Sequence, residues 1–387
     1  MLNIPLSGIK KIESIARSSD EYVSLSQGAL KVGGIPLKIK EHVQEILKTD
    51  KTDYYQSAWG IFPLREKLAQ ILNKKYNANL SNYQVMVSHG AIGALSSLFL
   101  TLLEPEDEVI LPEPTYPAYE KLTYLARCKP IFVSTLTNND TNFWQLDLEK
   151  IKKAVTNKTK IIVFSNPWNP LGLIIDKNKI KELLNWCEKK GIYLIVDEAY
   201  KRYAFDQSYK SCIDLVNQSE FFITVNSFSK NMAMSGWRVG YMVIPEKLNF
   251  PVGRMQDALL NCPNVPAQYA ALFALDHDEF TINFHSIIKN NLELTCQLLE
   301  PLVKKEIFSY QKPKGSFFIF LKTKEDDSEN LCMDILKRAK VSLIPGKFFG
   351  ESGKSFLRLC YARDEEIIKE GLNRLNNYFL ESNNQNV

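Results

Sequence analysis

Residues with reactive or charged side chains follow several short apolar runs in the middle of this sequence. Lys230 and Arg238 follow the run at 222–225, Asp197 follows the run at 192–196, and Asn169 follows the run at 161–164. If these runs are parallel strands, their carboxyl ends meet at one edge of a sheet, where ligands bind. There a lysine can form an imine with a carbonyl carbon, and an arginine can bind a phosphate.

Further candidates for the same edge belong to a helix start, two tyrosines and two serines. They are Gly90, Ala91, Ile92, Tyr116, Tyr200, Ser227 and Ser229. A helix N-terminus, hydroxyl groups and a guanidinium together make a phosphate cup. A tyrosine can stack on an aromatic ring or donate to a ring oxygen, and an aspartate can keep a pyridine nitrogen protonated. The set predicts a site for pyridoxal 5′-phosphate (PLP), with Lys230 as the imine-forming lysine.

Taken one at a time, these residues have ordinary structural explanations. A lone lysine is usually a solvated surface residue, and an aspartate after a strand often caps the next helix. An asparagine in a proline-rich turn, as at Asn169, suits the backbone there. The functional reading depends on the whole ordered set rather than on any single member.

The spacing of apolar runs predicts an α/β fold with a mostly parallel seven-stranded sheet covered by helices. The expected strands are 85–87, 108–111, 130–133, 161–164, 192–196, 222–225 and 240–244. Helix-length amphipathic segments separate them at 91–103, 115–126, 148–155 and 177–189. Such alternation of strands and helices is typical of parallel sheets with helices on both faces.

The pattern changes near residue 266 and predicts a second, smaller α+β domain. A long helical stretch is expected over 267–299, followed by strands at 316–320, 341–344 and 356–360 and by helices at 332–339 and 364–378. We therefore expect an N-terminal segment packing with the small domain (1–37), a large cofactor-binding domain (38–270) and a small C-terminal domain (271–387).

The ordered set resembles the fold type I PLP enzymes, specifically the class I/II aminotransferases of the bacterial aspartate and aromatic subgroup. Tyr55, with Gly60 after it, resembles the family segment whose tyrosine reaches into the partner subunit's site. Arg358, after Pro345-Gly346, resembles the arginine that clamps the substrate α-carboxylate, a task that suits a bidentate guanidinium. The resemblance implies a homodimer with shared active sites, and it assigns Gly28, Asn169 and Arg358 to substrate binding.

The resemblance also implies an activity. An amino group would move from an L-amino acid to a 2-oxo acid through an internal aldimine on Lys230 and a pyridoxamine phosphate intermediate. The alternative on the same fold is a PLP-dependent carbon–sulfur β-lyase of the cystathionine type. The substrate stays open: no second arginine for a dicarboxylate stands out, and Tyr54, Trp59 and Trp168 hint at neutral or aromatic side chains.

Bulk properties narrow the setting of this chemistry. The formal net charge is only +4 over 387 residues, so neither nucleic acid nor a membrane surface is an expected partner. Seven cysteines at wide spacing predict reduced thiols in a cytoplasmic protein, and the four histidines show no metal-ligand spacing. No metal site is expected.

Overall fold

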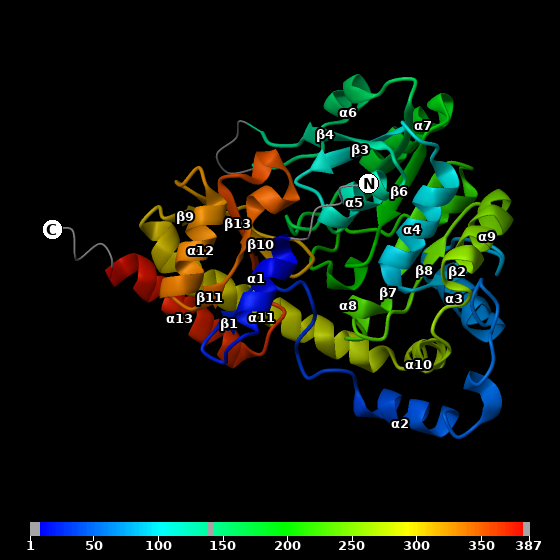
Figure 1. The fold of residues 1–387 in the computed structure, drawn as a ribbon, viewed down its shortest axis with the longest axis horizontal. Coiled ribbons are helices and arrows are strands. Elements are labelled where there is room, and N and C mark those ends of the chain that lie inside the picture. Colours follow the sequence, from blue (N-terminus) through cyan, green and yellow to red (C-terminus); the bar gives the residue numbers. More distant parts are fainter. Residues whose placement is uncertain (1–7, 138–142, 382–387) are drawn as a thin grey trace.

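The structure, a computed structural model, describes residues 8–137 and 143–381, which form two parts lying side by side (Figure 1). The larger part contains the long sheet, and the smaller part contains β9 to β13 with the helices around them. The helix α11 (Asp278–Lys304) runs along both parts.

The large sheet has seven strands in the order β2-β8-β7-β6-β5-β3-β4. They are β2 (Val85–Ser88), β3 (Glu108–Glu113), β4 (Lys129–Ser134), β5 (Thr159–Ser165), β6 (Tyr193–Asp197), β7 (Phe222–Ser227) and β8 (Gly240–Val243). Only β8 runs antiparallel to its neighbours; the other pairings are parallel. The predicted mostly parallel seven-stranded sheet is confirmed.

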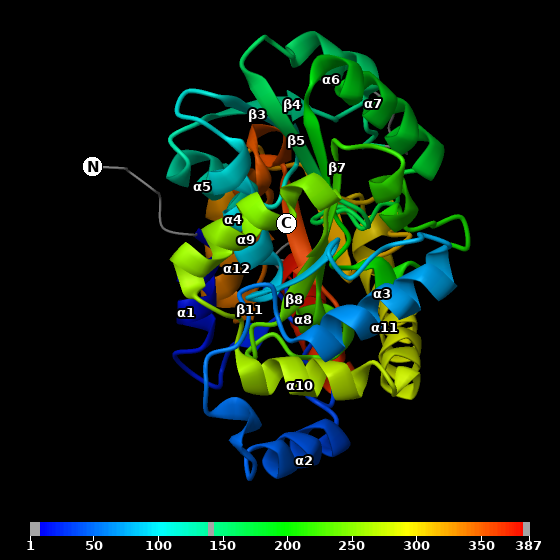
Figure 2. The same ribbon diagram turned by 90° about the vertical axis from the view of Figure 1, so that its right-hand side faces the viewer.

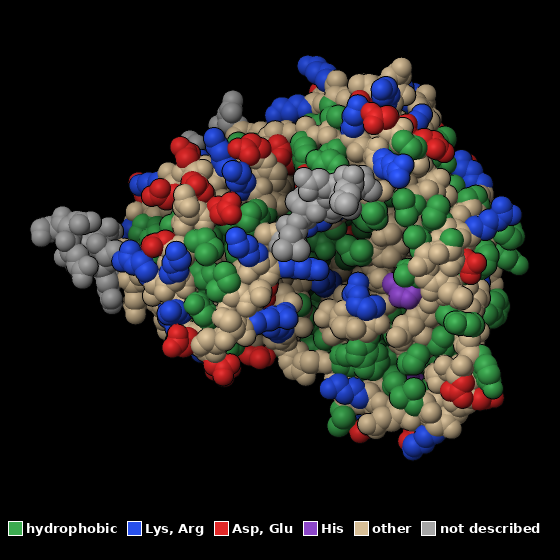
Figure 3. Space-filling view, viewed as in Figure 1, with side chains coloured by type: hydrophobic (Ala, Val, Ile, Leu, Met, Phe, Trp, Pro, Cys, Tyr) green, Lys and Arg blue, Asp and Glu red, His purple; other side chains and the backbone are tan. Residues whose placement is uncertain are grey.

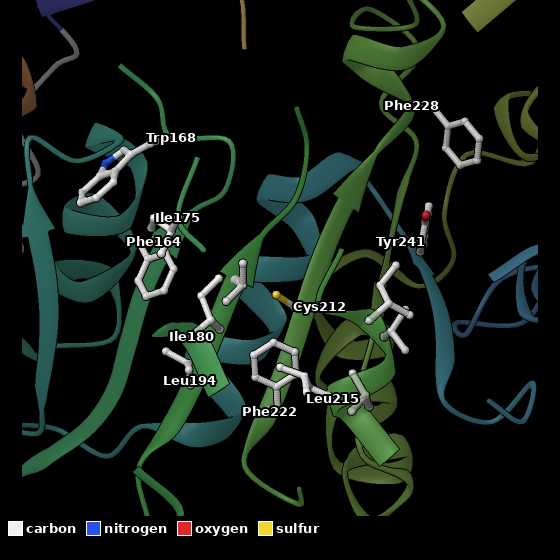
Figure 4. Packing of buried hydrophobic residues seen from close by; sticks show 14 of the residues in the cluster. Phe164, Trp168, Ile175, Ile180, Leu194, Cys212, Leu215, Phe222, Phe228 and Tyr241 are labelled. Carbon is white, nitrogen blue, oxygen red and sulfur yellow. The ribbon is translucent and has the colours of Figure 1, made fainter. Parts of the chain in front are cut away.

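Both faces of this sheet are covered, which explains why its strands are apolar at nearly every position. Along β5, Ile161 and Val163 pack with α4 (Gly90–Leu102), α5 (Pro117–Leu125) and α9 (Asn249–Leu260). The alternate residues Ile162 and Phe164 point to the other face, toward α3 (Phe62–Tyr76), α6 (Leu148–Ala154) and α7 (Lys177–Lys190). Figure 2 shows the two layers, and Figure 4 shows the second one close by, where Phe164, Ile180, Leu194 and Phe222 pack together.

The predicted helices between the strands correspond to α4, α5, α6 and α7. The helix expected from residue 115 begins two residues later, because Pro117 takes the first helical position. The α7 helix shows how local sequence sets its ends: Asp176 accepts from the backbone N–H of Asn178, and Gly191 closes the helix at φ +67°.

The small part is built on an antiparallel sheet of order β12-β13-β10-β9. Its strands are β9 (Phe308–Ser309), β10 (Phe318–Thr323), β12 (Ile344–Pro345) and β13 (Phe356–Cys360), covered by α12 (Ser328–Arg338) and α13 (Glu365–Glu381). The N-terminal segment joins it, because β1 (Val23–Ser24) pairs in parallel with β11 (Val341–Ser342) and α1 (Gly8–Ala16) contacts β11.

The helical stretch expected over 267–299 contains a break that the sequence did not predict. It consists of two helices, α10 (Val265–Ala274) and α11, because Leu275 ends the first and His277 adopts φ −125°, ψ 64° outside the helical region. The apolar periodicity continues across the break and therefore did not predict where the first helix ends. Asp278 at the new N-terminus suits the positive end of the helix dipole.

The remaining elements are short or peripheral. They are α2 (Leu37–Ile46), α8 (Phe228–Asn231) and the 3₁₀ turns η1 (Asp50–Thr52), η2 (Lys201–Tyr203), η3 (Ile213–Asn217), η4 (Glu246–Leu248), η5 (Gly346–Phe349) and η6 (Glu351–Gly353). The α2 helix packs on α10. Within 8–137 and 143–381, no helix has both the length and the apolar character needed to cross a membrane.

Candidate active site

A cavity of about 720 Å³ lies between the carboxyl ends of the large sheet, the small part and α1. Most of the residues singled out from the sequence line it. These are Gly28, Ala91, Ile92, Tyr116, Asn169, Asp197, Tyr200, Ser227, Ser229, Lys230, Arg238 and Arg358. In Figure 3 a hollow separates the two parts, and Lys and Arg side chains gather around it beside α1.

Lys230 reaches the cavity from the short helix α8, directly after β7. Ser227 caps that helix by accepting from the backbone N–H of Ser229 at 3.1 Å. The Lys230 Nζ donates to the carbonyl oxygen of Gly28. Burial lowers the pKa of Lys230 to about 8; the positive charges of Arg358 and Arg238 act in the same direction, against an opposing effect of Cys360. A lysine in this state is close to losing its proton at neutral pH.

The loop that offers Gly28 to this lysine is held by Arg363. Its guanidinium donates to the carbonyl oxygens of Ser24, Gln27 and Ala29, at 2.8, 2.6 and 2.9 Å. Arg363 is almost fully buried, and it connects the residues just before α13 to the N-terminal segment. Sequence spacing does not reveal this role, because the contacts join residues more than 330 positions apart.

Asp197 ends β6 and is fixed from two sides. Its Oδ1 accepts from the backbone N–H of Ala199 at 2.9 Å, and its Oδ2 accepts from the hydroxyl of Tyr119 at 3.0 Å. Burial raises its pKa to about 6, while these two hydrogen bonds lower it. The carboxylate is thus poised for a cationic partner in the cavity.

Tyr119 was missed by the sequence reasoning, although a signal exists. It lies three residues after Tyr116, which occupies the N-cap position of α5, and the two rings meet edge to face with centroids 5.5 Å apart. Ser165, which also lines the cavity, accepts from the backbone N–H of Asn169 at 2.9 Å and was missed as well.

Arg358 lies on β13 of the small part with only 2% of its surface exposed. Its Nη1 donates to Asn169 Oδ1 at 3.3 Å and its Nη2 to the carbonyl oxygen of Ser26 at 2.7 Å. The guanidinium stacks over the rings of Phe318 and Phe349, at 4.3 and 4.8 Å. Its buried Nε has no hydrogen-bond partner among the described residues. A buried guanidinium with an unused N–H suits a carboxylate ligand.

The start of α4 and Arg238 form the opposite end of the cavity. Gly90 has φ +68°, and a Cβ there would lie 2.8 Å from Nη2 of Arg238, so only glycine fits. Arg238 donates from Nη1 to the carbonyl oxygen of Ser235 at 2.8 Å and to Ser229 Oγ at 3.4 Å. Gly90 thus lets Arg238 approach the start of α4, although Gly90 itself does not line the cavity. Helix N–H groups, hydroxyls and a guanidinium meet at this end, which forms a glycine cradle.

Tyr200 stands between these two ends. It packs edge to face against Phe317 and Phe318, with ring centroids 5.0 and 5.6 Å away. Its ring centroid lies 6.0 Å from Lys230 Nζ, and burial raises the pKa of its hydroxyl well above the usual value. The hydroxyl therefore stays protonated and can act as a hydrogen-bond donor.

Several aromatic residues predicted to matter lie elsewhere. Tyr55 is 84% exposed and lies outside the cavity of its own chain, and Tyr54 is likewise exposed. Trp168 is buried and donates to the carbonyl oxygen of Pro114, and Trp59 donates to that of Asn249. None of Tyr54, Trp59 and Trp168 lines the cavity, so these residues do not support the neutral or aromatic substrate that we inferred from them.

Two lysines that the sequence did not single out line the mouth of the cavity. Lys10 comes from α1 and Lys121 from α5, next to the apolar side chains of Ile9 and Leu122. Burial, and then the ammonium of Lys10, lower the pKa of Lys121. In the described residues no group of three or more His, Cys, Asp or Glu side chains is placed to hold a metal ion.

Fold and cavity together define a two-part α/β enzyme whose cavity is lined by Lys230 and, at its two ends, by Arg238 and Arg358. The chain belongs to the family of class I and II aminotransferases, whose model matches residues 20–375. Its activity is amino-acid transamination.

Similar proteins carry names for different substrates. The aspartate aminotransferase of Sulfolobus acidocaldarius is 31% identical over 88% of this chain and 86% of its own length. Aromatic-amino-acid aminotransferase 2 of Thermococcus litoralis is 30% identical over 95% of this chain and 94% of its own. The crystal structure of the aspartate aminotransferase of Thermotoga maritima covers 97% of this chain and 98% of its own at a TM-score of 0.89 and 30% identity. The fold type I architecture is confirmed.

Proposed function

We propose that this aminotransferase holds pyridoxal 5′-phosphate in the cavity, bound to Lys230. The residues fit the group at both ends: the glycine cradle at Gly90 with Arg238 suits its phosphate, and Asp197 suits its ring nitrogen. Ala91, Ile92, Ser227 and Ser229 complete the phosphate end, and Tyr116, Asn169 and Tyr200 surround the ring. When bound, the cofactor supplies an electron sink that weakens the Cα–H bond of an amino acid.

The chain's own residues divide the remaining tasks. Arg358 binds the substrate α-carboxylate through its free Nε–H and Nη groups, and Asn169 orients that guanidinium. Lys230 takes the proton from the substrate Cα, since a pKa of about 8 leaves a useful fraction of neutral amine at working pH. Asp197 holds the ring proton through its charge. Gly28, against which Lys230 rests, contributes its backbone to the substrate side.

Two groups in the same cavity carry this proposal. Lys230 has only a carbonyl oxygen as its hydrogen-bond partner, and the buried Arg358 has an Nε without a partner among the described residues. A half-reaction screen tests it: each L-amino acid is added to PLP-loaded enzyme, and the cofactor's absorbance band is followed. Substrates should convert the band without an added 2-oxo acid. Release of pyruvate and ammonia from cystathionine would instead favour the carbon–sulfur β-lyase, which the relatives named above do not support.

We propose acidic amino acids and 2-oxo acids as the substrates. Lys10 and Lys121 are the charged cavity residues that the cofactor and the α-carboxylate leave unused, and neither has a carboxylate within 4.0 Å in the described residues. The name of the Sulfolobus acidocaldarius relative supports this choice. Lys121→Gln should lower kcat/KM for glutamate about tenfold, the equivalent of 1.4 kcal/mol, and leave that for phenylalanine unchanged. Equal losses for both would contradict it.

We further propose a homodimer with shared sites. Tyr55 is highly exposed, and Leu47, Tyr54 and Phe62 expose large apolar surfaces nearby in sequence. Such surfaces are typical of interfaces, and a two-fold dimer would carry Tyr55 to its partner's cavity. A fully active enzyme that elutes as a monomer in size-exclusion with light scattering would contradict this.

The division into domains and the cellular location complete the proposal. The chain divides into an N-terminal segment (1–37), a large domain (38–270) and a small domain (271–387), supported by the pairing of β1 with β11. Its location is cytoplasmic, supported by seven cysteines that are all free. The small molecules bound are the amino acid and the 2-oxo acid.

A further inference from the structure

A second cavity, of about 620 Å³, lies next to segment 197–203, the wall that carries Tyr200 and separates the two cavities. Its floor is the turn η2, and its sides are the end of α3, the start of α7 and the segment 206–211. The basic residues that line it are Lys74, Lys75, Lys177, Lys201, Arg202 and Lys210, and the acidic one is Asp206.

The carboxylates around this cavity do not balance its cations. Three cations are paired: Lys177 with Asp214 at 2.5 Å, Arg202 with Asp278 at 3.2 Å, and Lys201 with Glu198 at 3.8 Å.

The other three, Lys74, Lys75 and Lys210, have no carboxylate within 4.0 Å in the part of the chain that the structure describes. Asp206, the acidic lining residue, pairs instead with Lys314 outside the cavity, at 3.3 Å. The cavity therefore keeps an excess of positive charge.

One of the cations, Lys201, is held in place, whereas Lys74, Lys75 and Lys210 are exposed. The side chain of Lys201 is only 4% exposed; its Nζ donates to the hydroxyl of Tyr241 at 3.1 Å and lies 5.5 Å from the ring centroid of Tyr76. Lys75 lies beside it, where burial, then Arg202, lower its pKa to about 8. Neighbouring cations that repel one another are stabilised by an anion.

We propose that this second cavity binds a compact anion with at least two negative charges, of the phosphate-ester or diphosphate class. A guanidinium and several ammonium groups around one space match phosphate oxygens in geometry and charge. The site is separate from the cavity that holds Lys230 and does not depend on the function proposed for that cavity.

The position of the site connects it to the active-site wall. Asp197, Tyr200 and Lys201 belong to one short segment, and the hydroxyl of Tyr203 donates to the carbonyl oxygen of Lys230 at 2.7 Å. Behind this segment, Glu198 accepts from Ser211 Oγ. A bound anion would thus rest on the back of the segment that positions the reactive lysine.

Calorimetric titration of the PLP-loaded enzyme with inorganic pyrophosphate at low ionic strength tests the proposal. Wild-type enzyme should bind one pyrophosphate per chain, and Lys75→Gln/Lys210→Gln should raise the Kd at least tenfold. The matched control Lys153→Gln/Lys305→Gln removes the same charge elsewhere and should leave the Kd unchanged. Pyrophosphate should also raise the Tm of wild-type enzyme and of the control but not that of the cavity variant.

A further variant separates this site from the substrate carboxylate site. Arg358→Gln should leave pyrophosphate binding intact. The proposal is wrong if wild-type enzyme does not bind pyrophosphate, if the cavity variant binds it as tightly as wild type, or if Arg358→Gln abolishes binding.

Discussion

Two lysines stand on opposite sides of the same wall and show opposite solutions to burying an ammonium group. Lys201 is buried behind the wall, where it pairs with Glu198 and donates to the Tyr241 hydroxyl. Lys230 faces the cavity, where no carboxylate lies within 4.0 Å of it in the described ranges and its Nζ contacts only a carbonyl oxygen. One lysine has a carboxylate partner, and the other has none among the residues that the structure describes.

The surroundings explain the difference. Burial is the main effect that lowers the pKa of both lysines. At Lys201, Tyr76 and Glu198 oppose it and Arg202 adds to it; at Lys230, Cys360 and Asp197 oppose it and Arg358 and Arg238 add to it. The comparison teaches that burial alone does not make a lysine reactive. A carboxylate at ion-pair distance separates the two: Lys201 has Glu198 at 3.8 Å, and Lys230 has none in the described ranges.

The largest effect is expected at the reactive lysine. Lys230→Ala removes the amine that we assign to proton transfer at Cα, so kcat/KM should fall by about 10³-fold or more. Steady-state transamination assays measure the loss, and circular dichroism checks that the variant folds. Lys305→Gln, on an exposed helix end, should keep full activity. Full activity in Lys230→Ala would refute the assigned role.

The paired lysine should show the reverse pattern, a loss of stability. Lys201→Met leaves the buried Glu198 carboxylate without its cation, which costs about 3–5 kcal/mol in comparable buried pairs. Urea unfolding measures this as a lower midpoint. Glu198→Gln/Lys201→Met should recover part of the loss, because the amide can still bond to Ser211 and Cys212. Unfolding of the single variant at the wild-type midpoint would remove the contrast between the two lysines.

Asp197 extends the contrast to pH. Its pKa in the folded chain is about 6, above the ordinary 3.8, so the folded state binds more protons than the unfolded state between these values. Cofactor-free protein should therefore lose stability as pH rises through this window.

Asp197→Asn removes that loss. At pH 7.5 the cofactor-free variant should be more stable than wild type by about 3 kcal/mol at most, and the gain should vanish near pH 4. Thermal unfolding across pH 4 to 8 measures both. A variant that is less stable than wild type throughout would show that the hydrogen bonds of Asp197 outweigh its desolvation.

The sequence predicted the sheet and the residues at its edge well, and the reason is local. Residues such as Asn169, Asp197 and Lys230 follow strands whose apolar runs mark their ends, and parallel strands collect those ends at one edge. The break between α10 and α11 escaped prediction because the apolar spacing continues through it.

Other parts of the site depend on contacts between distant segments, which spacing does not reveal. Arg363 holds the loop around Gly28 from the far end of the chain, and Lys10 enters the cavity mouth on α1. The second cavity likewise joins the end of α3 to η2, segments about 125 residues apart. Tyr55 stays a prediction about a partner that a single chain does not contain.

The smallest expected effects come from a matched pair of hydroxyl deletions, one on each side of the wall. Tyr119→Phe removes a hydrogen bond to Asp197, and Tyr241→Phe removes one from Lys201; each is worth about 1 kcal/mol. Because Asp197 serves the cavity, Tyr119→Phe should weaken PLP binding about fivefold, measured by fluorescence titration. Because Lys201 serves the fold, Tyr241→Phe should lower the unfolding midpoint and leave PLP affinity unchanged. If both variants changed PLP affinity equally, the wall would act as one unit, and the division between a reactive and a structural lysine would fail.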